Sequence, residues 1–161
     1  MFAGFAIIAK QVDCHLTVVG HGFDLINVQQ MMQNLGIADK VTFAGYIPNA
    51  GLKAYLNNAH VLLHTALFET GCAVIQEAMA SGVAVCGTQV GILDDIGDRY
   101  AVMFPPGYAG GLAEQALKLA NDPDLFENVT REAHQWIVKH DAKWAYENYL
   151  AFFNEIIKKK H

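Results

Sequence analysis

Two carboxylates, Glu69 and Glu77, frame the stretch of this 161-residue chain whose residue types best fit a binding site. The first acid is followed by Thr70-Gly71-Cys72, which is poor sequence for a helix interior and favours a turn into a helix. Glu69 is therefore expected in a loop, and Glu77 in the second turn of the helix that follows. In these positions both acids can border one crevice.

The helix that begins between the two acids could bind an anion. The N–H groups of Cys72, Ala73 and Val74 have no acceptor in the first turn, and the positive end of the helix dipole lies behind them. Such a helix start binds a diphosphate without a metal ion or a lysine. A carboxylate on each side can accept hydrogen bonds from sugar and ribose hydroxyls. Taken alone, the spacing favours a plainer interpretation, in which Glu69 is a solvated loop acid and Glu77 a surface residue.

Short apolar runs alternate with helical patterns around this stretch. We expect strands at 15–19, 41–43, 60–64, 83–86 and 100–104, and helices at 2–10, 25–35, 48–56, 72–81, 92–97, 109–121, 124–139 and 142–159. The alternation predicts an α/β fold, a Rossmann-like parallel sheet with helices on both faces. Such folds place ligands at the carboxyl ends of the strands. Function is therefore expected in the loops that follow Val19, Phe43, His64, Cys86 and Phe104.

Composition limits the class of protein. The length fits one domain, and a chain with 53% hydrophobic and 17% charged residues is long enough and apolar enough to bury a core. No apolar run reaches the length of a membrane span, and residues 1–9 lack the basic front end of a signal peptide. A net charge of -5 argues against nucleic acid as a main partner. Three cysteines without metal or redox spacing fit a reducing cytoplasm.

Other ligand classes are weakly indicated. Gly20-His21-Gly22 follows a strand but lacks the third glycine and the distant acid of a dinucleotide site. The seven histidines form no i, i+4 pair with an acidic base, so no metal site is expected. His21 and His64 lie at strand ends, where each either contacts a ligand or fills space. Cys72 is expected to be a small packed residue rather than a reactive thiol.

The run FETGCAVIQEAMASGVAV, preceded by LLHTAL, resembles the E-x7-E signature of retaining GT-B glycosyltransferases, specifically glycosyltransferase family 4. LTVVGHG resembles the family's strand and Gly-x-Gly loop, and KHDAKWAYENYLAFFNEII resembles its terminal helix. The resemblance covers almost the whole chain. It implies that residues 1–161 are a single nucleotide-sugar donor-binding domain, the C-terminal half of a GT-B enzyme truncated at its N-terminus and without the acceptor-binding domain.

The resemblance implies roles for the residues around the helix start. Glu69, as the catalytic carboxylate, would contact the donor sugar near its reacting carbon. Glu77 would bind the ribose hydroxyls of the nucleotide. The backbone of Cys72, Ala73 and Val74 would hold the diphosphate.

Residues at the other strand ends would complete the donor site. Tyr46 and Ile47 would lie against the base, and Gly20 and Gly22 would leave room for the ligand. His64 would stand at the end of its strand beside the donor. The resemblance implies no metal and no cofactor, with the nucleotide-diphosphate sugar as donor substrate.

The same resemblance implies that two features are absent. The family's first strand, and the Arg and Lys of the loop after it that neutralise the diphosphate, would precede Met1. By the family's strand order, the absent strand belongs between the strands at 15–19 and 60–64. Unpaired edges inside a sheet are costly. We therefore expect either that another chain fills the gap or that these two strands close on each other.

The resemblance implies transfer of a hexose to a glycan or lipid-linked acceptor with retention, in polysaccharide biosynthesis. The alternative is a non-catalytic nucleotide-sugar binding module or subunit that pairs with a separate acceptor-binding chain. An epimerase on the same fold fits less well, because its acid–base residues would come from the absent half. Self-association through the terminal helix is also expected. The expected location is the cytoplasm, peripheral to a membrane where the acceptor or the absent domain binds one.

Overall fold

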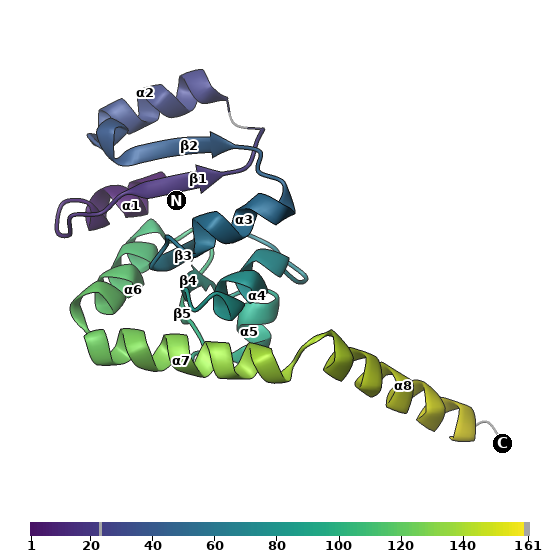
Figure 1. Ribbon diagram of the computed structural model, residues 1–161. Coiled ribbons are helices and arrows are strands. Elements are labelled where there is room, and N and C mark those ends of the chain that lie inside the picture. Colours follow the sequence, from purple (N-terminus) through teal and green to yellow (C-terminus); the bar gives the residue numbers. More distant parts are fainter. Residues whose placement is uncertain (23, 160–161) are drawn as a thin grey trace.

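A computed structural model describes residues 1–22 and 24–159 (Figure 1). Phe23, Lys160 and His161, the last of the seven histidines, lie outside the described residues. The elements are α1 (Phe2–Ile8), β1 (Leu16–Val19), α2 (Leu25–Leu35), η1 (Ala38–Lys40), β2 (Val41–Gly45), α3 (Asn49–Leu56), β3 (Val61–His64), α4 (Ala73–Ala80), β4 (Ala84–Thr88), α5 (Ile92–Ile96), β5 (Val102–Phe104), α6 (Ala109–Asn121), α7 (Pro123–Lys139) and α8 (Ala142–Lys159). Every strand and helix predicted from the pattern is present, with small differences at the ends.

Local side chains set the ends of the helices. The carboxylate of Asp24 accepts a hydrogen bond from the N–H of Asn27 at the start of α2. Gly36 ends that helix with a φ of 69°, a conformation that glycine adopts without steric cost. Gly82, with a φ of 72°, follows Ser81, the C-cap residue of α4.

The strands form two separate parallel sheets. β1 pairs with β2, and β4 lies between β3 and β5. Among the described residues, one edge of β1 and one edge of β3 therefore have no strand partner. Leu63 of β3 packs against the cluster that contains Leu16 and Val18 of β1, so the two strands are neighbours without forming a ladder. The expectation that they close on each other is wrong. The alternative, that another chain fills the gap, stays a prediction.

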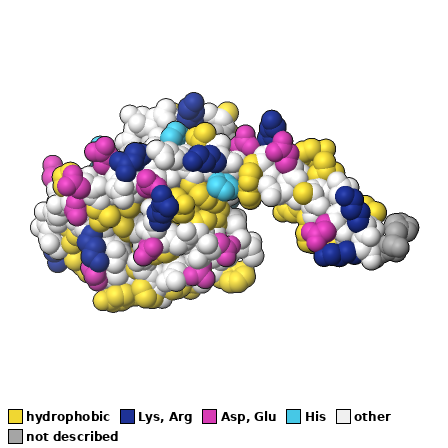
Figure 2. Space-filling model, turned by 90° about the horizontal axis from the view of Figure 1, so that it is seen from below, with side chains coloured by type: hydrophobic (Ala, Val, Ile, Leu, Met, Phe, Trp, Pro, Cys, Tyr) yellow, Lys and Arg dark blue, Asp and Glu magenta, His cyan; other side chains and the backbone are white. Residues whose placement is uncertain are grey.

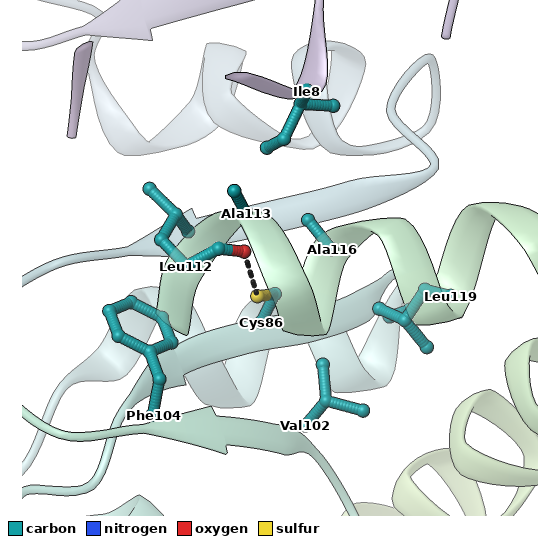
Figure 3. Close-up of a cluster of buried hydrophobic side chains, with 9 residues drawn as sticks. Ile8, Cys86, Val102, Phe104, Leu112, Ala113, Ala116 and Leu119 are labelled. Carbon is teal, nitrogen blue, oxygen red and sulfur yellow. Dashed lines mark hydrogen bonds between the residues drawn. The ribbon is translucent and has the colours of Figure 1, made fainter. Parts of the chain in front are cut away.

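β4 is the centre of the core, and all of its residues are buried. Ala84 and Cys86 belong to a cluster with side chains of α1, β5 and α6 (Figure 3). Val85 belongs to a second cluster, with side chains of α3, α4, α5 and α7. Helices thus cover both faces of the β3–β4–β5 sheet, which confirms the predicted α/β, Rossmann-like class.

The β1–β2 pair is covered differently. Leu16 and Val18 are buried against residues of α1 and α2, whereas Thr17 and Val19 are exposed. Side chains of a strand alternate between its two faces. This pair therefore has one covered and one open face, and the expected cover on both faces holds for the larger sheet only.

α8 extends away from the rest of the molecule (Figure 1). None of its described residues is buried. Phe152 and Phe153 are each 57% exposed and Trp144 is 44% exposed, and Figure 2 shows apolar side chains along this arm. Among the described residues, no helix combines the length and the apolar character that crossing a membrane requires.

Candidate functional site

The loop between β3 and α4 brings together three of the predicted site residues. A ring nitrogen of His64, a carboxylate oxygen of Glu69 and Sγ of Cys72 all lie within 4.8 Å of one another. His64 ends β3, Glu69 lies in the loop, and Cys72 is the N-cap residue of α4. All three residues are half-buried. Their order in the sequence predicts one loop, but not that their polar atoms converge.

Glu69 turns its carboxylate back onto its own loop. Its Oε1 accepts hydrogen bonds from the N–H groups of Thr70, at 3.0 Å, and Gly71, at 3.3 Å. Among the described residues Oε2 has no hydrogen bond or ion-pair partner. One oxygen therefore shapes the loop, and the other remains available to a ligand.

The loop is held from the neighbouring strand β4. Thr88 is 1% exposed, and its Oγ1 donates a hydrogen bond to the carbonyl oxygen of Ala66 at 2.7 Å. Gly87 lies opposite His64 in the β3–β4 ladder. A β-carbon at Gly87 would lie 2.3 Å from Cδ1 of Leu93 and 3.4 Å from Cβ of His64. A side chain at this position would therefore require the buried Leu93 side chain to move.

Sequence reasoning missed Thr88, Gly87 and Gly91, although a signal for them exists. The apolar run of β4 ends in Gly87-Thr88, and a small residue followed by a hydroxyl is unusual at the end of a fully buried strand. Gly91 precedes α5 with a φ of 55°. Each of these residues shapes the loop that carries Glu69 without being a candidate ligand itself.

His64 has an unusual environment. Its Nδ1 is buried and has no hydrogen-bond partner among the described residues. Burial lowers the pKa of His64 below its ordinary value, an effect that the nearby Glu69 carboxylate partly opposes. A neutral imidazole keeps one lone pair on the ring, which a proton or a metal can use. Buried nitrogens are normally paired, so this one calls for an explanation.

The start of α4 has the form predicted for an anion site. Ala73 and Val74 lie in its first turn, where N–H groups have no intrahelical acceptor. The side chain of Cys72 makes no capping hydrogen bond. Glu77 lies in the second turn and is half-buried, and its carboxylate has no hydrogen bond or ion pair among the described residues. The predicted placement of the two acids, one in the loop and one in the helix, is confirmed. The groups they bind stay predictions.

The loops after β1 and β2 meet each other. The N–H of Gly20 donates to the carbonyl oxygen of Gly45 at 2.8 Å. The rings of His21 and Tyr46 lie 5.8 Å apart between centroids, and both residues are exposed. Gly22 has a φ of 88° and open space around it. Three predicted site residues, Gly20, Gly22 and Tyr46, thus lie with their neighbours His21 and Gly45 at the carboxyl ends of the smaller sheet.

Ile47 follows Tyr46 directly in the sequence. Its side chain packs at the start of α3, where a β-carbon added to Gly51 would lie 3.1 Å from Cγ2 of Ile47. The predicted site residues therefore form two groups in the described structure, one on the β1–β2 loops and one on the β3–α4 loop. Among the described residues, no hydrogen bond, ion pair or ring contact joins Tyr46 or Ile47 to the His64, Glu69 and Cys72 group.

A separate hollow of about 440 Å³ lies at the other end of α4. It is lined by residues of the α4–β4 turn and α7, including Gly82, Phe126, Thr130 and His134. His134 contacts the carbonyl oxygen of Met79 through Nδ1 at 3.2 Å. None of the predicted site residues lines this hollow.

The chain is similar to known sugar-transferring proteins. Residues 3–136 match the family described as Glycosyl transferases group 1. The chain is 33% identical over 134 residues to N-acetyl-alpha-D-glucosaminyl L-malate synthase of Bacillus anthracis, covering 81% of this chain and 34% of the relative. It is 34% identical over 86 residues to GDP-mannose-dependent alpha-mannosyltransferase of Mycolicibacterium smegmatis, and the match covers 53% of this chain and 21% of the relative. It is 22% identical over 138 residues to the gpi3 subunit of phosphatidylinositol N-acetylglucosaminyltransferase from Schizosaccharomyces pombe, and the match covers 81% of this chain and 30% of the relative. The chain thus spans about a third or less of the length of these relatives.

Solved structures share the fold. Anabaena HepE in complex with UDP superposes with a TM-score of 0.82 and 17% identity, covering 96% of this chain and 44% of that one. The C-terminal domain of a glycosyl transferase group 1 family protein from Francisella tularensis superposes with a TM-score of 0.77 and 18% identity, covering 86% and 75%. At this identity the likeness concerns the fold, which is that of a GT-B Rossmann-like domain.

Proposed function

The chain belongs to the group 1 family of glycosyl transferases, and from that premise we propose that it binds the donor of a retaining hexosyltransferase of glycosyltransferase family 4. The donor is a nucleotide-diphosphate sugar, and the acceptor is a glycan or a lipid-linked glycan. The observation that carries the proposal is the placement of Glu69 and Glu77 on either side of the free N–H groups that begin α4.

The donor would lie across the start of α4. The N–H groups of Cys72, Ala73 and Val74 hold the diphosphate, because a helix N-terminus offers both donors and a positive dipole end. Glu77, half-buried and without a hydrogen bond or ion pair among the described residues, accepts hydrogen bonds from the ribose hydroxyls. Oε2 of Glu69 accepts a hydrogen bond from the sugar, while Oε1 stays bonded to the loop.

The base would lie on the loops after β1 and β2. Tyr46 is 68% exposed and offers a ring face, and Ile47 adds apolar surface at the start of α3. Gly20 and Gly22 both have positive φ, and Gly22 has open space around it. A ligand can therefore approach this backbone closely.

This domain would contribute to the reaction by positioning the donor sugar and by stabilising the charge on the leaving diphosphate. The leaving diphosphate gains negative charge as the bond to the sugar breaks, and the N–H groups at the start of α4 stabilise that charge. Glu69 fixes the sugar for reaction with the acceptor. Retention at the anomeric carbon follows from the proposed membership of family 4.

Relatives support a nucleotide-sugar donor. The Bacillus anthracis relative is named as a synthase of N-acetyl-alpha-D-glucosaminyl L-malate, and the Mycolicibacterium smegmatis relative as a mannosyltransferase that depends on GDP-mannose. The Anabaena protein of the same fold was solved in complex with UDP. We propose that this chain likewise binds a nucleoside diphosphate sugar and uses no metal in the transfer step.

A second candidate is a donor-binding module that works with a separate acceptor-binding chain. The observation that favours it is the divided sheet, in which β1 and β3 each have an edge without a strand partner. The Schizosaccharomyces pombe relative is named as one subunit of its enzyme, which fits such an arrangement. Donor binding without turnover by the chain alone, and turnover once an acceptor-binding chain is added, would support this candidate over the first.

Calorimetric titration with UDP, GDP, ADP and their sugars tests donor binding. We expect one nucleotide to bind, and Glu77→Ala to weaken that binding by about 10-fold or more, since hydrogen bonds to charged groups contribute about 1.5–3 kcal/mol. Gln76→Ala is the matched control, because Gln76 is the exposed neighbour of Glu77 in α4. Wild-type protein that binds no nucleotide at millimolar concentration would contradict the proposal. Equal binding by Glu77→Ala would refute the role given to Glu77.

A further inference from the structure

α8 joins the rest of the molecule through its first turn. The helix points away from the body of the domain in Figure 1, and none of its described residues is buried. Among the described residues, one ring contact links α8 to the elements before it, between Trp144 and His140. We propose that His140 is a conformational latch, which lies on Trp136 and fixes the direction of α8 through Trp144.

His140 stands where the backbone leaves one helix and enters the next. It is the C-cap residue of α7, with a φ of -112° and a ψ of 46°, outside the helical region. Asp141 follows, and its Oδ1 accepts a hydrogen bond from the N–H of Trp144 at 2.8 Å, which starts α8 at once. The angle between α7 and α8 therefore depends on the soft dihedrals of these two residues.

The imidazole of His140 is fixed to α7. Its Nδ1 lies 2.7 Å from the carbonyl oxygen of Trp136. Because a carbonyl oxygen only accepts, Nδ1 carries the proton and donates this hydrogen bond. The ring also stacks on the indole of Trp136, with centroids 4.4 Å apart and an angle of 19° between the planes. A hydrogen bond and a stacked face thus hold the imidazole in one orientation.

Trp136 is itself anchored in the body of the domain. It packs against the buried cluster that contains Ala101 and Ala133, and its ring lies 5.8 Å from that of Tyr100. Trp136 and His140 are therefore the fixed half of the latch. Trp144, which is 44% exposed, is the half that moves with α8.

Trp144 meets the imidazole in an edge-to-face arrangement, with centroids 4.6 Å apart and an angle of 67° between the planes. An aromatic pair of this kind shifts an equilibrium by about 2- to 10-fold. That is enough to favour one direction for a helix that has no buried residues, and small enough for the contact to be released. The latch thereby determines where exposed apolar side chains of α8, such as Tyr149 and Phe153, are presented.

The plainer alternative is that the backbone at the helix ends sets the angle and the ring of His140 is incidental. Two substitutions separate these possibilities. His140→Phe keeps a ring at this position but removes the donor to the Trp136 carbonyl oxygen. His140→Asn keeps an N–H donor close to the place of Nδ1 but removes the ring.

Trp144 can report on its own release. The chain has two tryptophans, so Trp136→Phe leaves Trp144 as the only one and still supplies a ring beneath His140. The full chain with Trp136→Phe is therefore the background for both substitutions of His140. His60→Asn is the matched control in that background, since His60 is an exposed histidine before β3.

We expect His140→Asn to raise the acrylamide quenching constant of Trp144 about 2-fold, because an indole that is 44% exposed becomes fully exposed once the ring contact is lost. His140→Phe and His60→Asn should leave the quenching constant unchanged. Small-angle X-ray scattering, extrapolated to zero concentration, should show a broader range of maximum dimensions for His140→Asn than for the background.

Three results would overturn the proposal. The first is a quenching constant or a scattering profile that His140→Asn leaves unchanged. The second is equal release of Trp144 in His140→Phe and His140→Asn, which would assign the effect to the hydrogen bond. The third is a loss of helix in His140→Asn, measured by circular dichroism, which would mean that the ring keeps α8 folded rather than directed.

Discussion

Gly91 lies against the main chain of Glu69. A β-carbon at Gly91 would be 2.6 Å from the carbonyl oxygen of Glu69 and 3.0 Å from its carbonyl carbon, closer than real β-carbons approach backbone. Gly91 also has a φ of 55°, which an L side chain rarely adopts. The loop that carries Glu69 can therefore take this position only because Gly91, at the start of α5, has no side chain.

We expect Gly91→Ala to push the Glu69 loop away from its position. The backbone strain should lower the free energy of unfolding by about 1–3 kcal/mol, and the displaced loop should weaken nucleotide binding measured by calorimetry. Gly97→Ala is the matched control at the other end of α5. Gly97 has a φ of 81°, but nothing lies within 4 Å of its added β-carbon. The control should lose stability without losing binding, and equal loss of binding in both variants would contradict the positional role of Gly91.

Thr88 holds the same loop through a hydrogen bond rather than through contact. Replacing its hydroxyl in Thr88→Val keeps the shape of the side chain and leaves the carbonyl oxygen of Ala66 without its 2.7 Å donor. We expect the free energy of unfolding to fall by about 1–3 kcal/mol in chemical denaturation. Thr88→Ser, which keeps the donor, should lose less. Thr17→Val, at an exposed strand position, should change stability by less than about 0.5 kcal/mol.

The sequence predicts the site's framework because that framework depends on local signals. Thr70-Gly71-Cys72 interrupts helical sequence, so Glu69 must lie in the loop and Glu77 in the helix, as the structure shows. The contacts of Gly91 with Glu69 and of Thr88 with Ala66 depend on how separate elements pack. Nothing in the spacing of these residues reports a 2.7 Å hydrogen bond between β4 and a preceding loop. The convergence of His64 with Cys72 escapes prediction for the same reason.

Cys86 should be inert to thiol reagents in the folded protein. Burial raises the pKa of the Cys86 thiol to about 12, and its side chain is 0% exposed. At pH 8 only about one such thiol in 10,000 is ionised, and the thiolate is the reactive form. We expect mass spectrometry after alkylation to find Cys86 modified only when the protein unfolds. Rapid modification of Cys86 under native conditions would show that the β4 core opens locally.

The ion pair between Arg99 and Glu132 should make stability depend on acid pH. Nε and one terminal nitrogen of Arg99 donate to the same oxygen of Glu132, at 2.9 and 2.6 Å. These hydrogen bonds hold the pKa of Glu132 below its ordinary value of 4.5, and the nearby charges of Arg99 and Arg131 add to the effect. A carboxyl with a lowered folded-state pKa contributes stability above the unfolded-state value and loses it as pH falls through the folded-state value.

We therefore expect the free energy of unfolding to fall more for the wild type than for Glu132→Gln as the pH is lowered from 5 into the acid range. Urea denaturation at each pH measures this quantity. The pair is at the surface, so the difference should be small and should shrink in high salt. Arg99→Gln should reduce the pH dependence of the free energy of unfolding in the same way. Combining Arg99→Gln with Glu132→Gln should reduce it no further. Parallel profiles for the wild type and Glu132→Gln would show that the pair does not couple to folding.

The divided sheet could not be resolved from the sequence, because strand patterns specify which residues form strands but not which edges meet. Residues 15–19 and 60–64 have the sequence pattern of ordinary strands. The strands that they form, β1 and β3, nevertheless do not pair with each other. A parallel strand directs alternate N–H groups to opposite sides. β4 therefore has partners for both sets, whereas β1 and β3 have partners for one. The difference is physical and can be measured.

Hydrogen–deuterium exchange should distinguish β4 from the two edges. We expect slow exchange throughout Ala84–Thr88, and fast exchange at about half of the amides in Leu16–Val19 and Val61–His64, because an amide without a partner opens to water without breaking a ladder. If another chain supplies a strand to the gap, the fast amides of β1 and β3 should become protected when that chain is added, while β4 should not change. Uniform slow exchange in all three strands of the isolated chain would mean that β1 and β3 already have partners in solution, and would remove the structural reason for expecting a second chain there.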